Sequence, residues 1–249
     1  MIKSEKLTIL SGGVRLGGVF FYPEAQERVP GVCICHGIPR VNRPVEEKGY
    51  PALAKRFCEA GCAALIFNFQ GTSGSEGEFS FSAWSRNVSD AVTHLASSPL
   101  VDPERLGLLS FSAGAYVSWS VVARDQRIRV FASCSSPSDL SKIPLINEGI
   151  KYAKEMGILR IKDVERAVRE LRSDFQKLSP LKWAGKISPR PVLIVHGDRD
   201  DVIPVESAYE LYERAKEPKK LLIFKGVDHQ IRNSQEAMDA VVEWMVENI

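Results

Sequence analysis

A regular alternation of short apolar segments with amphipathic segments constrains the fold of this chain more than any other feature. Strands that are apolar along their whole length are typical of parallel sheets covered by helices on both faces. Such runs occur at 31–35 (GVCIC), 62–69 (CAALIFNF), 105–111, 128–134, 191–195 and 220–224. Segments with helical periodicity separate most of them. The pattern predicts successive strand–helix–strand units and a mainly parallel sheet.

The remaining segments complete this α/β pattern. Residues 6–10 and 14–22 are expected to form an opening hairpin, with Gly12 and Gly13 in its turn. A helix after the strand at 31–35 is expected to end at Gly61. Further helices are expected at 82–97, 113–124, 205–215 and 234–247. Because the chain has 249 residues and no internal repeat, we expect one α/β domain over 1–249.

The span from 137 to 186 interrupts this rhythm, because it is predicted to contain helices and no strand. An apolar stripe with spacings of three and four residues predicts one amphipathic helix. The stripe consists of Ile161, Val164, Val168, Leu171, Phe175 and Leu178. We interpret 137–186 as a helical cap inserted over a site, and we expect the helix to roof an apolar acyl pocket. The alternative is an ordinary helix packed at the edge of the sheet.

Composition excludes several functional classes. The 33 basic and 31 acidic residues leave a net charge of +2, which is too balanced for an electrostatic nucleic-acid binder. No apolar run approaches the roughly 20 residues of a membrane helix, and the start MIKSEKLTIL lacks an apolar stretch of signal-peptide length. We therefore expect a cytoplasmic protein without nucleic-acid or membrane partners. The five cysteines lack zinc spacing and are expected to be buried thiols, so neither a metal nor another cofactor is predicted.

The strongest chemical signal is the segment Ser110-Phe111-Ser112-Ala113-Gly114, where a strand ends and a helix begins. A serine at such a corner is exposed at the edge of the sheet, in a tight turn that requires small neighbours. The start of the helix also favours a developing negative charge. This position predicts that Ser112 is a nucleophile.

A serine hydroxyl needs an imidazole to accept its proton, and the imidazole needs a carboxylate to orient it. Loops after the last two strands supply both groups, with His229 in the final one. We prefer Asp200 as the acid, with Asp198 and then Asp201 as alternatives in the same loop. Asp228 is poorly placed, because adjacent side chains on extended backbone point apart.

The loop after the strand at 31–35 supplies the remaining element of an acyl-transfer site. It reads His36-Gly37-Ile38-Pro39, in which the glycine lets the backbone turn inward. Because Pro39 has no N–H, the N–H groups of Ile38 and Ala113 are predicted to form an oxyanion hole. His36 is expected to fix this loop through a ring hydrogen bond.

Together these motifs resemble the α/β-hydrolase superfamily over nearly the whole chain. The chain is similar to its single-domain serine esterases and to prolyl-oligopeptidase-like and cinnamoyl-esterase-like enzymes. The motifs are HG at 36–37, S-x-S-x-G at 110–114, HGDRDDVIP at 196–204 and GVDH at 226–229. The resemblance implies a mainly parallel, twisted sheet with helices on both faces, a Ser…Asp…His chain order, and Asp200 and His229 as acid and base.

The chain departs from the family pattern in two places. Ser110 replaces the first glycine of G-x-S-x-G, and Asn68-Phe69-Gln70-Gly71 replaces the usual D-x-R-G. The serine is small enough for the turn to close. The glycine- and serine-rich loop at 70–77 still matches the family.

The leading functional hypothesis is a cofactor-independent serine hydrolase that acts on small-molecule carboxylic esters of small to medium acyl groups. Aminopeptidase, acylaminoacyl-peptidase or thioesterase activity would use the same side chains, as would acyl transfer to an acceptor other than water. A catalytically silent binding protein on the same fold is the non-enzymatic alternative. The oligomeric state is left open, with a homodimer as one alternative.

Overall fold

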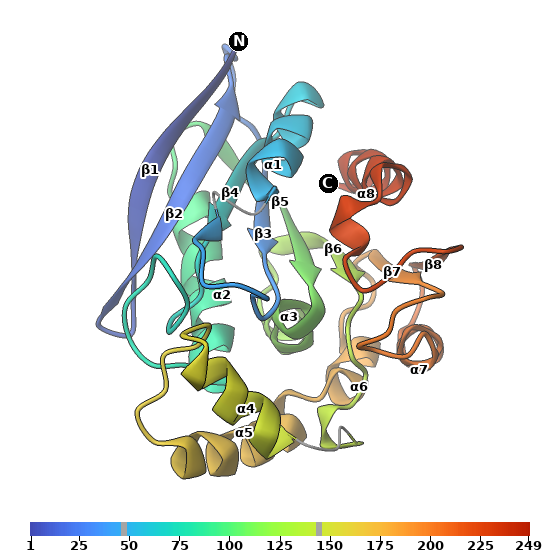
Figure 1. Cartoon of the computed structure of the whole chain (residues 1–249). Coiled ribbons are helices and arrows are strands. Elements are labelled where there is room, and N and C mark those ends of the chain that lie inside the picture. The colour runs from blue at the N-terminus through green and yellow to red at the C-terminus, as the bar shows by residue number, and fades with distance from the viewer. Residues whose placement is uncertain (46–48, 143–145) are drawn as a thin grey trace.

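The fold is built on an eight-stranded sheet (Figure 1). The computed structural model describes residues 1–45, 49–142 and 146–249. The strand order is β1-β2-β4-β3-β5-β6-β7-β8. The strands are β1 (Ile2–Ser11), β2 (Val14–Pro23), β3 (Val29–Cys35), β4 (Ala63–Phe67), β5 (Val101–Phe111), β6 (Ile128–Cys134), β7 (Val192–Gly197) and β8 (Lys219–Phe224).

The sheet is mainly parallel, as the sequence predicted. Only β1 with β2 and β2 with β4 pair antiparallel, and the other neighbours are parallel. The opening hairpin is also confirmed. Gly12 and Gly13 turn the chain with φ values of 56° and 85°, in the left-handed region that favours glycine.

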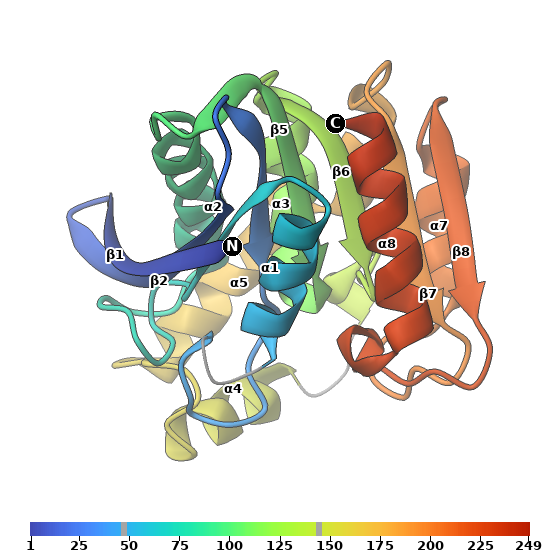
Figure 2. The same cartoon turned by 90° about the horizontal axis from the view of Figure 1, so that it is seen from above.

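Helices cover both faces of the sheet (Figure 2). Two of them, α1 and α8, pack on one face, and α2, α3 and α7 pack on the other. The helices are α1 (Tyr50–Glu59), α2 (Phe81–Ala96), α3 (Ser112–Arg124), α4 (Ile146–Glu155), α5 (Val164–Leu178), α6 (Pro180–Trp183), α7 (Glu206–Arg214) and α8 (Gln235–Asn248). Within the described ranges, none of the helices is long and apolar enough to cross a membrane.

Side-chain alternation along the strands explains why both faces are buried. Cys33 and Cys35 on β3 belong to one core cluster, and Val32 and Ile34 belong to the other. All five cysteines are buried and free, as predicted. In α1, burial of the Cys58 thiol raises its pKa to about 12. This thiol therefore stays protonated and behaves as a small apolar side chain.

The span 137–186 contains α4, α5 and α6, and its residues 143–145 lie outside the described ranges. The first two helices lie beyond the carboxyl ends of the central strands (Figure 1). The helix predicted from the apolar stripe begins later than expected. Asp163 caps α5 by accepting a hydrogen bond from the Arg166 N–H at 3.0 Å. Ile161 therefore lies before the helix, although it is buried with the rest of the stripe.

The apolar face of α5 packs against α2 and α3. The Phe175 ring lies 6.1 Å from that of Phe81 and 6.3 Å from that of Tyr116, centroid to centroid. The Tyr116 hydroxyl donates a hydrogen bond to the Phe175 carbonyl at 2.9 Å. The buried Asp174 carboxylate accepts from the N–H and hydroxyl of Ser82, at the start of α2. The stripe therefore extends the core between the insertion and the sheet.

Candidate active site

Ser112 occupies a sharp turn between β5 and α3. The strand ends at Phe111, and Ser112 itself has a φ of 52°, in the left-handed region that is rare for residues other than glycine. A Cβ on Gly114 would lie 2.1 Å from the His36 carbonyl oxygen, so only glycine fits there. The buried Ser110 hydroxyl is satisfied by a 2.8 Å hydrogen bond with the Ser118 hydroxyl. The departure from the usual glycine at 110 is thus accommodated.

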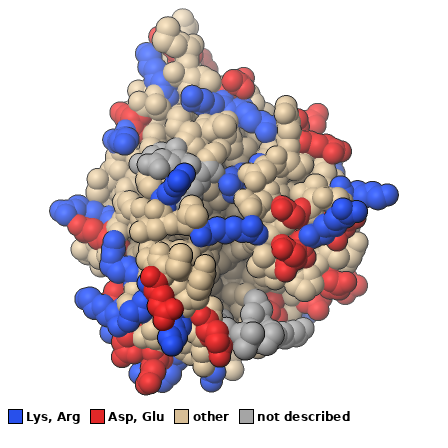
Figure 3. All heavy atoms as spheres, in the orientation of Figure 1, with Lys and Arg blue, Asp and Glu red and all other residues tan. Residues whose placement is uncertain are grey.

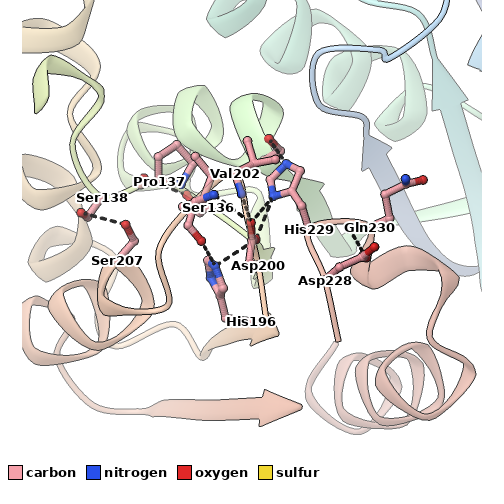
Figure 4. Close-up of polar contacts among 12 residues, drawn as sticks. Ser136, Pro137, Ser138, His196, Asp200, Val202, Ser207, Asp228, His229 and Gln230 are labelled. Atoms are coloured by element: carbon pink, nitrogen blue, oxygen red, sulfur yellow. Dashed lines mark hydrogen bonds and ion pairs between the residues drawn. The ribbon is translucent and has the colours of Figure 1, made fainter. Parts of the chain in front are cut away.

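The structure brings Ser112, His229 and Asp200 together at the carboxyl ends of the strands. Figure 4 shows the His229 ring beside the Asp200 carboxylate. The His229 Nε2 lies 3.0 Å from the Ser112 Oγ. Its Nδ1 lies 2.8 Å from the Asp200 Oδ2 and 3.0 Å from Oδ1. With Asp200 ionised, Nδ1 donates its proton to the carboxylate, which leaves Nε2 free to accept the serine proton.

The Asp200 carboxylate is held from several sides, and its side chain is 0% exposed. Its Oδ1 accepts hydrogen bonds from the N–H groups of Val202 at 3.0 Å and Ile203 at 2.8 Å. Burial alone would raise the Asp200 pKa. Hydrogen bonds from His196, His229 and the Ile203 N–H outweigh that effect and hold the pKa well below its usual range. The carboxylate is therefore ionised at neutral pH.

The alternative acids have other contacts. Asp198 is exposed and accepts a hydrogen bond from the Gly226 N–H at 2.5 Å. Asp201 is exposed as well. Asp228 accepts from the Gln230 N–H at 2.8 Å and so stabilises its own loop. Among these carboxylates only Asp200 contacts His229.

His196 also contacts Asp200, and the sequence reasoning missed it. Its Nε2 lies 3.1 Å from the Asp200 Oδ2 and 3.0 Å from the Ile203 carbonyl oxygen, which requires a proton on Nε2. Its buried Nδ1 has no hydrogen-bond partner in the part of the chain that the structure describes. The spacing of four residues between His196 and Asp200, in a turn after a buried strand, is the signal that could have indicated this contact.

The loop after β3 lies directly against Ser112. A Cβ on Gly37 would lie 2.7 Å from the Ser112 Cβ, so the backbone can come this close to Ser112 only because residue 37 is a glycine. The His36 Nε2 accepts a hydrogen bond from the Phe69 N–H at 3.1 Å, which is the ring hydrogen bond expected from the sequence. Neither the Ile38 nor the Ala113 N–H donates to an acceptor within the described residues. Their role as an oxyanion hole stays a prediction.

A cavity of about 440 Å³ opens above Ser112. Its described lining comes mainly from the loop after β3 and the loop that carries His229. The lining residues are His36, Gly37, Ile38, Pro39, Arg40, Val41, Arg43, Gly49, Tyr50, Phe111, Ser112, Ser135, His229, Gln230, Arg232 and Asn233. Sequence reasoning missed the three arginines. Two of them follow the HG motif within eight residues without an intervening acid, which could have drawn attention to them.

The amphipathic helix was predicted to roof an apolar acyl pocket, but none of its residues is found in the described lining of this cavity. Among residues 137–142 and 146–186, none lines the cavity. Val168 and Phe175 instead face the core beside α2 and α3. The physical reason is that the apolar stripe is already covered by these two helices, so no apolar face of α5 remains for a substrate.

No group of three or more His, Cys, Asp or Glu side chains could hold a metal ion in the described ranges. The triad contacts consist of hydrogen bonds among protein groups. Acyl transfer by a serine, a histidine and a carboxylate requires no cofactor.

Comparison with known proteins adds to this geometry. The model of the prolyl oligopeptidase family matches residues 52–249, which is most of the chain. The chain belongs to the prolyl oligopeptidase family. The resemblance inferred from the motifs is thereby confirmed, and the protein is a serine hydrolase with the α/β-hydrolase fold.

Proteins with different named activities are similar to this chain. The polyketide transferase GrgF of a Penicillium species is 26% identical over 259 residues, covering 87% of this chain and 86% of that protein. The crystal structure of the same α/β hydrolase has a TM-score of 0.77 at 22% identity, with 99% and 98% of the two chains covered.

Two further solved structures share the fold. Est1E from Butyrivibrio proteoclasticus, solved with ferulic acid bound, has a TM-score of 0.76 at 23% identity and covers 97% of this chain and 98% of its own. The acylaminoacyl peptidase of Pyrococcus horikoshii has a TM-score of 0.74 at 17% identity, but this chain covers only 42% of it.

Proposed function

We propose that this chain is a cofactor-independent carboxylesterase that cleaves esters of small to medium acyl groups. The observation that carries the proposal is the contact between the Ser112 Oγ and the His229 Nε2 at 3.0 Å, on a turn that exposes the serine to the cavity. The serine, the base and the acid are then Ser112, His229 and Asp200.

In the first step, the Ser112 oxygen attacks the ester carbonyl while its proton passes to the His229 Nε2. The Asp200 carboxylate stabilises the imidazolium that forms. The N–H groups of Ile38 and Ala113 hold the carbonyl oxygen as it becomes negative. The His229 Nε2 then returns the proton to the departing alcohol, leaving an acyl-enzyme.

In the second step, water attacks the acyl-enzyme and His229 accepts its proton. The tetrahedral intermediate collapses, the proton returns to Ser112, and the carboxylic acid leaves. An amine, an alcohol or a thiol in place of water would give acyl transfer with the same groups.

Two observations favour esters over peptides with a free amino terminus. Three arginines and no Asp or Glu line the cavity among the residues that the structure describes, and a guanidinium group repels a substrate ammonium group. The second observation is the similarity to Est1E, which was solved with ferulic acid bound.

A panel of p-nitrophenyl esters, hydroxycinnamate esters, thioesters and aminoacyl anilides tests the proposal with one preparation. We expect ester turnover to dominate, and Ser112→Ala to reduce it by about 10⁴-fold. The thermal transition of this variant should stay close to that of the wild type, because only a hydroxyl is removed. Dominant anilide turnover would contradict the esterase assignment, and wild-type turnover by Ser112→Ala would contradict the nucleophile.

A further inference from the structure

We propose that the cavity contains an anion-binding subsite, formed by Arg40, Arg43 and Arg232, that selects esters carrying a second, negatively charged group. The proposal rests on the proposed esterase function, because it names the class of substrate that this function would take. The charged group is an anionic oxygen group, a carboxylate or a phosphate.

The first observation is position. All three arginines line the cavity that contains Ser112 and His229. Arg40 and Arg43 lie in the loop that carries the Ile38 N–H. Arg232 lies in the 3₁₀ turn Ile231–Asn233, directly after the histidine loop. The positive groups therefore approach the nucleophile from two sides.

The second observation concerns the charged groups around these arginines. None of the three makes an ion pair with a described residue. Elsewhere many arginines are paired, for example Arg15 with Glu76 and Arg127 with Asp125. Figure 3 shows basic side chains along the upper border of the hollow on this face, with acidic ones farther right and below. Among the described residues, the charge of these arginines is therefore not neutralised by a paired carboxylate.

The third observation is that one of the arginines is held in place. The Arg232 guanidinium carbon lies 4.7 Å from the centroid of the Tyr50 ring. The Tyr50 side chain is buried, and burial raises its pKa despite the opposing effect of Arg232, so the ring stays neutral. Stacking on an aromatic face restricts the guanidinium while leaving its N–H groups able to donate. Less conformational freedom is then lost when an anion binds.

The chemistry of guanidinium fixes the kind of ligand. Its planar set of donors matches carboxylate and phosphate oxygens, often through two parallel hydrogen bonds. It repels an ammonium group. An ester with one anionic end would place that end among the arginines and its carbonyl carbon at Ser112.

Matched ester pairs test the subsite. With charge on the acyl side, mono-p-nitrophenyl adipate is compared with p-nitrophenyl hexanoate, which has the same number of acyl carbons. With charge on the alcohol side, p-acetoxybenzoate is compared with p-acetoxybenzamide. We expect kcat/KM for the anionic member of at least one pair to exceed that of its neutral partner by about 10-fold at low ionic strength.

The arginine variants should reduce this preference. Arg40→Gln, Arg43→Gln and Arg232→Gln should each lower the anionic-to-neutral ratio about 5-fold, as expected for a partly exposed ion pair. NaCl at about 1 M should weaken the wild-type preference, because screening then acts over about 3 Å. Arg28→Gln is the matched control, since this exposed arginine precedes β3 at the opposite edge of the sheet and should leave the ratio unchanged.

A binding measurement separates this proposal from the proposed function. Calorimetry with Ser112→Ala should show that adipate or butyl phosphate binds, and that Arg232→Gln in the same background weakens binding; the tighter ligand identifies the group. Arginine-dependent binding without any ester turnover would reject the esterase and keep the subsite. Ser112-dependent turnover with a ratio near one in both pairs, or a ratio insensitive to all three arginines, would overturn the subsite.

Discussion

The contacts of Asp200 allow the consequence of Asp200→Asn to be worked out atom by atom. In the wild type, Oδ1 accepts from the Val202 and Ile203 N–H groups, and Oδ2 faces the His229 Nδ1 and the His196 Nε2. An amide in this place must keep its oxygen at the Oδ1 position, because both backbone groups there are donors. Its NH₂ group then replaces Oδ2 and points at His229.

This orientation changes which nitrogen of the His229 imidazole carries the proton. Because the amide NH₂ donates, the His229 Nδ1 must accept, and its single proton moves to Nε2, which faces the Ser112 Oγ. The base then carries a proton where it should accept one. An inverted tautomer of this kind costs about 10⁴-fold in kcat, which corresponds to about 5.4 kcal/mol in activation free energy. The NH₂ group also meets the Nε2–H of His196, and we expect a loss of about 1–3 kcal/mol in stability.

The assay is the initial rate of ester hydrolysis, with Asp198→Asn as the control in the same loop. Asp198 accepts only the Gly226 N–H among the contacts described, and an asparagine can still accept it, so we expect a loss of about 10-fold or less. Rates should be compared well below the melting temperature of each variant, which circular dichroism provides. If Asp198→Asn costs more than Asp200→Asn, or if Asp200→Asn keeps kcat within 10-fold of the wild type, the tautomer argument is refuted.

Three further predictions follow from other contacts. Gly114→Ala should destabilise the protein by about 1–3 kcal/mol and reduce kcat, because its Cβ would lie 2.1 Å from the His36 carbonyl oxygen and displace the Ile38 N–H. A wild-type melting temperature together with wild-type ester turnover would contradict this. Phe175→Ala should lower the free energy of unfolding in denaturant by about 3–5 kcal/mol. It should leave the order of preference among acyl lengths unchanged, since the ring packs on Phe81 and Tyr116 rather than in the cavity. A changed order would indicate that α5 contacts the substrate. Because the Asp200 pKa is lower in the folded than in the unfolded chain, its carboxylate contributes stability above about pH 4 that is lost as the pH falls through the folded value. The unfolding free-energy difference between the wild type and Asp200→Asn should therefore shrink in acid, and a difference that grows there would contradict the assignment.

Periodicity and loop position were sufficient to predict the sheet and the chemical groups. Strands buried on both faces leave unbroken apolar runs, and parallel strands bring their following loops to one edge. Ser112 follows β5 directly and His229 lies in the loop after β8, so their meeting could be expected from the order of the elements. The choice of Asp200 over Asp198 came from the family resemblance, and its geometric reason is the pair of backbone N–H groups at Val202 and Ile203.

What the sequence could not give were the contacts between segments far apart in the chain. An apolar stripe shows that a face is buried, but it does not show against what, and α5 covers α2 and α3 rather than the cavity. The near-zero net charge likewise says nothing about local distribution. Arg40 and Arg232 are 192 positions apart and line the same cavity only because β3 and β8 both end at the same edge.

Gly37 and Gly114 pack closely around Ser112 and His36. Substitutions are therefore excluded in one part of the site and tolerated in another. A larger side chain at Gly37 or Gly114 would collide with Ser112 or with the His36 backbone, so these two positions require glycine. The lining of the cavity, by contrast, includes exposed loop residues, among them Ile38 at 41% exposure and Val41 at 52%. Changes in these loops can alter what enters without moving the serine. We therefore expect substitutions that change the substrate range, whether natural or from directed evolution, to accumulate in these loops while the reaction stays the same.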